Sequence, residues 1–302
     1  MTDRKKILGV GAVLVLAAVG WFAAVHWEEI MDRGRRMIET RDPLVLIRGA
    51  GGEKGESGEY REVFRKKIVP SEAEKSVLKE QTLAGVRGEP ETRDRYGALR
   101  EEVFLFCDYL DHQPYVASAG LEGGVYQNLL SMLALLSRNP PVISGETRDV
   151  YILVKNTAHF YRELKGKRIA LIKEILAEEK EALEPVSELF YDWIMTGIAE
   201  KRPEIHASLK DLYIYSSFFL DTLGGKAYLA RRDSRTRILV RYYSILILDE
   251  ANRKGLNHYG IDILPQVALL MDDISNQKGL EYRDRYLIRL KAIQEEYLKK
   301  RS

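Results

Sequence analysis

Two pairs of a histidine and a carboxylate have residue types and spacing that could do chemistry. Asp108 and His112 are four residues apart, and so are His159 and Glu163. On a helix such residues share a face, so each pair could serve as an acid–base pair or supply ligands to a transition metal. The chain lacks the HExxH and Glu-x-x-His sequences of zinc proteases and di-iron bundles. We therefore favour ordinary pairing on helix faces and assign no catalytic residue, no metal ligand and no cofactor.

The single cysteine is a candidate nucleophile. Cys107 follows Phe104-Leu105-Phe106, an apolar run that predicts a buried and inert thiol. A nucleophilic role would need a nearby base such as His112, and this is the less favoured alternative. Neither a G-x-S-x-G elbow nor a GK[ST] phosphate loop is present, although glycines are frequent over residues 49–58. The sequence predicts a protein that is not an enzyme.

A group of arginines is the most concentrated charge in the chain. Its members are Arg231, Arg232, Arg235, Arg237 and Arg241. Such a cluster can bind phosphates, acidic lipid headgroups or an acidic protein face. The acidic stretch 174–188 can equally pair with it, within the chain or across a dimer. We favour this pairing over a partner protein, and a partner protein over lipid or nucleic acid.

Tyrosine is abundant, with 17 residues in the chain. Tyrosine is enriched at protein interfaces, so we assign four tyrosines, together with the arginines, to a candidate partner surface: Tyr242, Tyr243, Tyr286 and Tyr297. Simple packing in the core and at its boundary is the alternative, and we give it the greater weight. The last expected helix, with Tyr286 and Tyr297, could cap the core or recruit a partner helix.

An apolar run lies close to the N-terminus. Residues 7–25 contain no charged or strongly polar side chain. As a helix they would span roughly 28 Å, close to a hydrocarbon core of about 30 Å. We predict an uncleaved transmembrane helix over 7–27, because the apolar core of a cleaved signal peptide, the alternative, is usually shorter. Residues expected to form this membrane anchor include Ile7, Leu14, Leu16, Trp21, Phe22 and Val25.

The charges that flank the anchor predict its orientation. Arg4, Lys5 and Lys6 precede the apolar run and favour a cytoplasmic N-terminus. Arginines also follow the run, which weakens the contrast between the two sides. We expect a cytoplasmic tail at 1–6 and a periplasmic body, with the lipid bilayer of a bacterial inner membrane as a partner.

Beyond the anchor, the sequence predicts an all-α fold. Residues 28–70 predict a juxtamembrane helix and a Gly-rich loop or small β-hairpin, and 71–302 predict an α-helical domain. We expect about nine helices after residue 70, in a multi-helix bundle or a divergent α-solenoid, since no repeat signature recurs. The expected helices include 91–112, 116–137, 147–164, 169–183, one that starts near Pro185, and 203–219, 227–254, 261–274 and 280–300.

Composition limits the classes of function. The 302 residues are 45% hydrophobic and 30% charged, with a net charge of +2, which excludes a disordered chain and gives no basic field for nucleic acid. The combined features predict a membrane-anchored scaffold or assembly component of a cell-envelope complex that acts through protein contacts. Its partners would be other membrane or envelope proteins, with homo-oligomerisation left open. A sensory ectodomain that signals through a partner is the alternative, and a metal-dependent enzyme is a weaker one.

Overall fold

The computed structural model describes residues 95–142, 155–156, 158–159, 162–164, 166–223 and 234–301. Within these residues every regular element is a helix, so the all-α expectation is confirmed for this part of the chain. The predicted anchor over 7–27, the juxtamembrane segment 28–70 and Arg231 and Arg232 lie outside the described residues. None of the helices in the described ranges is both long and apolar enough to cross a bilayer.

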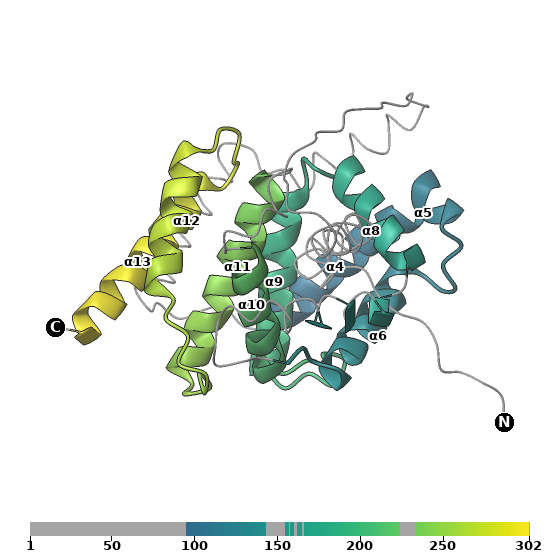
Figure 1. The fold of residues 1–302 in the computed structure, drawn as a ribbon. Helices are drawn as coiled ribbons and strands as arrows, with labels where there is room; N and C mark the ends of the chain where they lie inside the picture. The colour runs from purple at the N-terminus through teal and green to yellow at the C-terminus, as the bar shows by residue number, and fades with distance from the viewer. Residues whose placement is uncertain are drawn as a thin grey trace, which may run out of the picture.

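Nine helices have bounds within the described residues, and Figure 1 shows their arrangement. The helices are α4 (Arg95–Asp111), α5 (Pro114–Ser118), α6 (Val125–Arg138), α8 (Gly166–Glu178), α9 (Leu183–Ala199), α10 (Leu209–Leu223), α11 (Ser234–Arg253), α12 (Leu264–Asn276) and α13 (Arg283–Arg301).

The helices succeed one another across the molecule. In Figure 1, α4, α5, α6 and α8 lie on one side, α9, α10 and α11 in the middle, and α12 and α13 on the other side. Their contacts follow this order, because α4 packs on α6 and α9, α11 packs on α9, α10 and α12, and α12 packs on α13. Helix α9 therefore connects the N-terminal helices to the C-terminal ones.

The segment expected to form one helix over 116–137 forms two helices, α5 and α6. Gly120 and Gly123 lie between them with φ angles of +60° and +74°. This left-handed backbone, which glycine adopts easily, interrupts a right-handed helix. Asp111 then helps to start α6, because its Oδ1 and Oδ2 accept the Val125 N–H at 2.9 and 3.0 Å. The glycines thus separate two helices that the hydrophobic spacing had joined.

One further helix start differs from the expected one, whereas another agrees with it. A helix was expected over 169–183, but α8 begins three residues earlier, at Gly166. Pro185 lies within the first turn of α9, which begins two residues earlier at Leu183. The first turn tolerates proline because its N–H groups have no partner within the helix.

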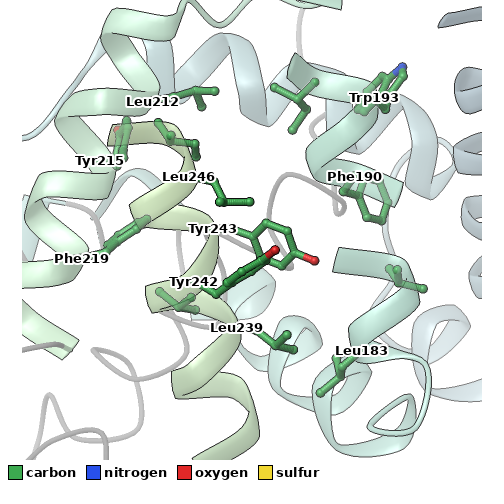
Figure 2. Packing of buried hydrophobic residues seen from close by; sticks show 14 of the residues in the cluster. Leu183, Phe190, Trp193, Leu212, Tyr215, Phe219, Leu239, Tyr242, Tyr243 and Leu246 are labelled. Atoms are coloured by element: carbon green, nitrogen blue, oxygen red, sulfur yellow. The ribbon is translucent and has the colours of Figure 1, made fainter. Parts of the chain in front are cut away.

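Aromatic side chains dominate the centre of the hydrophobic core. Figure 2 shows Tyr242 and Tyr243 on α11 close to α9, which carries Phe190 and Trp193. Removing a side chain of this size from water stabilises the fold by roughly 1.5–3 kcal/mol. The largest fully buried side chains include Trp193, Tyr96, Tyr213, Tyr242, Tyr243, Tyr286, Phe106, Phe190 and Phe219.

Candidate functional site

Three of the four tyrosines assigned to a partner surface lie in the interior. Tyr242, Tyr243 and Tyr286 each expose 0% of their surface. This finding corrects the surface assignment and agrees with the alternative of core packing. The ring centroids of Tyr242 and Tyr286 are 4.4 Å apart, and those of Tyr242 and Tyr243 are 5.0 Å apart. Such large rings stabilise the fold most when they leave water and pack on one another.

Glu188 of α9 binds two arginines of α13 and one tyrosine of α11. Its Oε1 lies 2.8 Å from Arg285 Nη2 and 2.7 Å from Arg289 Nη1. Its Oε2 accepts a hydrogen bond of 2.9 Å from the Tyr243 hydroxyl. Burial acts against the charged carboxylate, but the two arginines and the hydroxyl outweigh it, so the pKa of Glu188 lies below its ordinary value. Both oxygens of this buried charge are therefore compensated.

Glu184, one turn earlier on α9, caps the N-terminus of α13. Its carboxylate oxygens accept the backbone N–H groups of Glu281 and Tyr282 at 3.0 and 2.9 Å. The N–H groups at a helix start lack partners within the helix and carry partial positive charge, which favours a carboxylate there. The Arg235 guanidinium also approaches Glu184, at 3.7 Å. The two N–H groups and Arg235 act to lower the pKa of Glu184, but burial has the larger effect and raises it.

Asp192, one turn after Glu188, faces α4. Its Oδ2 lies 2.6 Å from Arg95 Nη2. Burial, followed by the nearby negative charge of Glu188, raises the pKa of Asp192, and the arginines oppose this only in part. The three carboxylates of α9 thus form a stripe at helical spacing that reaches α4, α11 and α13. We call this group the charged network: Glu184, Glu188, Asp192, Arg95, Arg235, Arg285, Arg289 and Tyr243.

The described arginines of the predicted cluster form ion pairs within the chain. Arg235 meets Glu184, which belongs to the acidic stretch 174–188, so the expected pairing inside the chain exists at this position. Arg237 and Arg241 are on the same helix, α11, but both approach a different carboxylate, Asp273 of α12. The structure therefore divides the cluster between two carboxylate partners on different helices.

Tyr297, the fourth tyrosine, is partly exposed near the end of α13. Its hydroxyl accepts a hydrogen bond of 2.6 Å from Asn252 Nδ2 of α11. Burial raises the pKa of Tyr297 to about 12. The Lys300 ammonium lies 5.3 Å from the centre of its ring. Tyr297 thus links α11 to α13 while it keeps some exposed surface.

The two residues of each histidine–carboxylate pair are neighbours, at the C-terminal end of α4 for Asp108 and His112 and in a helical segment for His159 and Glu163. His112 Nδ1 lies 2.7 Å from the carbonyl oxygen of Asp108, and His159 Nδ1 lies 3.9 Å from Glu163 Oε1. In the part of the chain that the structure describes, no three His, Cys, Asp or Glu side chains gather as a metal site would require. Cys107 is fully buried, and burial raises the pKa of its thiol, so the thiolate needed for nucleophilic attack is disfavoured.

The sequence interpretation missed half of the charged network. Glu184 and Glu188 belong to the acidic stretch 174–188, but Asp192, Arg95, Arg285 and Arg289 were not singled out, although Glu188 and Asp192, and likewise Arg285 and Arg289, have the i,i+4 spacing of one helix face. That spacing could have identified a charged stripe on α9 and another on α13. It could not have shown that the two stripes face each other.

The charged network can hold helices together. Each of its carboxylates already binds an arginine, and Glu188 and Glu184 also accept hydrogen bonds from a hydroxyl or from backbone N–H groups. No protein-family model matches the chain, and no significant match was found among curated proteins or solved structures. The geometry itself must therefore support any assignment of function.

Proposed function

We propose that this protein is a single-pass, membrane-anchored scaffold or assembly component of a cell-envelope complex and that it acts through protein contacts. One observation carries the proposal: the charged network joins α4, α9, α11 and α13 through side chains that lie far apart in the sequence. The partly buried pair of Glu188 and Arg289, for example, spans 101 residues. A buried, compensated charge specifies which helices pair, because any other pairing leaves a charge uncompensated.

The arrangement of the helices suits a scaffold. We assign the body to a helical array, since the described helices follow one another across the molecule from α4 to α13 in Figure 1, and α9 and α11 link the two sides through contacts with α4 and α12. Arrays of this kind present long helix faces to partners. Exposed apolar side chains occur at both ends of the described array: Phe104 on α4, Leu269 on α12 and Leu298 on α13 are 51%, 55% and 54% exposed.

The location belongs to the same proposal. The predicted helix over 7–27 anchors the chain in a bacterial inner membrane, with residues 1–6 in the cytoplasm and the body in the periplasm. The partners are other membrane or envelope proteins or a second copy of the chain. A reporter fused to the C-terminus should be active outside the cytoplasm. A reporter that is active only in the cytoplasm would overturn this orientation.

Site-specific crosslinking in cells tests the scaffold function. A photoreactive residue replaces Phe104, Leu269 or Leu298 in the full chain, and a matched control replaces Leu129, which is 0% exposed. We expect at least one exposed position to yield a discrete adduct of constant mass and the buried control to yield none. A detergent-extracted chain that is monomeric, together with no adduct from any exposed position, would contradict the proposal.

A further inference from the structure

Two arginines on α11 share one carboxylate of α12. Arg237 and Arg241 are one helical turn apart, and both approach Oδ2 of Asp273. Arg237 Nη2 lies 3.5 Å from this oxygen, and Arg241 Nη1 donates a hydrogen bond to it. Among the described residues, Asp273 is the only carboxylate that forms an ion pair with either arginine. The three side chains therefore carry one uncompensated positive charge.

This positive charge is largely removed from water. The side chain of Arg241 is 4% exposed, whereas the side chains of Arg237 and Asp273 are 28% and 30% exposed. Burial lowers the pKa of Arg241, Asp273 opposes this effect, and the neighbouring Arg237 adds to it. A buried cation that lacks full compensation is costly, so the position favours an additional anion.

Hydrogen-bond donors also remain unused. The Nε atoms of Arg237 and Arg241 are both buried without a hydrogen-bond partner. A guanidinium group has five N–H donors, and a single carboxylate oxygen engages few of them. Arg235 of the same helix uses more of its donors, because its guanidinium group donates hydrogen bonds to the carbonyl oxygens of Lys180 and Gly279.

We propose that Arg237 and Arg241 form a binding site for a phosphoryl anion, which enters beside the exposed edges of Arg237 and Asp273. A phosphoryl group has several oxygens around one centre, so it can accept from two guanidinium groups at once, and its charge balances the unpaired cation. Inorganic phosphate and the headgroup of an anionic lipid both supply this chemistry. The lipid source alone rests on the proposed membrane anchoring.

Binding of inorganic phosphate to the full chain in detergent tests the site. Calorimetric titration at constant ionic strength should show saturable binding by the wild-type chain. We expect about tenfold weaker binding by Arg237→Gln, because one charge-assisted hydrogen-bonding group is lost. Arg253→Gln is the matched control, since Arg253 lies on the same helix and already pairs with Asp249 and Glu296 at 3.2 and 2.7 Å. The Arg253→Gln variant should bind phosphate with the same affinity as the wild type.

Asp273→Asn provides a second test that does not depend on the arginine variants. The change removes the internal carboxylate, so phosphate should bind more tightly and should restore the thermal stability that the variant loses. Sodium chloride at the same ionic strength should not restore it. No saturable binding by the wild type, or equal phosphate affinity in the wild type and Arg237→Gln, would overturn the proposal.

Reconstitution into lipid nanodiscs separates the two sources of phosphoryl group. Apparent phosphate affinity is compared in phosphatidylcholine discs and in discs that also contain phosphatidylglycerol. Weaker affinity in the anionic discs supports a lipid headgroup as the ligand, because the headgroup competes for the site. Equal affinity supports free phosphate. Absence of binding in detergent and in both discs overturns the site, whereas the scaffold function is judged separately by crosslinking.

Discussion

Tyr243 of α11 donates a hydrogen bond of 2.9 Å to Glu188 of α9, and both side chains lie in the interior, 0% and 6% exposed. The same carboxylate binds Arg285 and Arg289 of α13. One acidic residue therefore sets the relative positions of three helices. Since an isolated buried carboxylate would be costly, the three partners must be present together.

Removing Glu188 should strongly destabilise the protein. In Glu188→Ala, Arg285 and Arg289 lose the carboxylate that they share, so we expect the free energy of unfolding to fall by about 3–5 kcal/mol. Urea unfolding of the full chain in mild detergent, followed by circular dichroism, measures the loss. Glu295→Ala, at an exposed position of α13, is the control and should change stability by less than about 0.5 kcal/mol. A similar small effect at Glu188 would contradict the importance of the network.

The stability should depend on pH in a way that reports Glu188. Its pKa is lowered in the folded state, so its contribution is fully present above its ordinary value of 4.5 and is lost as the pH falls through the folded value. Asp192 has a raised pKa and acts with the opposite sign, and Glu188→Gln also removes the negative charge that helps to raise it, so a comparison of the wild type with this variant reports the two carboxylates together. The difference in unfolding free energy between these chains should be constant near neutral pH and should shrink in acid. A difference that stays constant down to about pH 3 would disprove this account.

The close packing of α9 on α4 should make Gly197 sensitive to substitution. A β-carbon at this position would lie 2.5 Å from Ile205 Cγ1 and 2.8 Å from Tyr96 Cε2. We expect Gly197→Ala to lower the free energy of unfolding by about 1–3 kcal/mol through overpacking. Gly166→Ala is the control, because nothing lies within 4 Å of the added carbon, and alanine should be neutral or slightly stabilising at this helical position. Equal effects of the two substitutions would show that the predicted clash is relieved.

Cys107 should report the opening of the helices around α4. It is the single cysteine of the chain and is 0% exposed. A thiol reagent should therefore modify the native chain about a hundredfold or more slowly than the urea-unfolded chain, because reaction requires local opening. A second thiol at the exposed position in Gln127→Cys should react rapidly and serves as the positive control. Fast modification of Cys107 in the native wild type would show that α4 opens readily.

Several parts of the fold could be predicted from sequence because they depend on local pattern. Helical spacing identified α4 and the C-terminal helices, and the apolar surroundings of Cys107 correctly indicated a buried thiol. The boundary between α5 and α6 was missed because the hydrophobic spacing continues across Gly120 and Gly123, whose positive φ angles end one helix before the next begins.

The sequence by itself determined a helical chain in which arginines, carboxylates and tyrosines recur at the spacing of helix faces. Only the tertiary structure decided which of these faces meet. Glu188 and Arg289 are 101 residues apart, and Arg237 and Arg241 share Asp273 on another helix. Residue types and spacing define the charge along one helix, but pairing between helices depends on how the whole core packs, which no local pattern specifies. For this reason tyrosines that resembled an interface became the core, and neighbouring arginines were divided between different carboxylates.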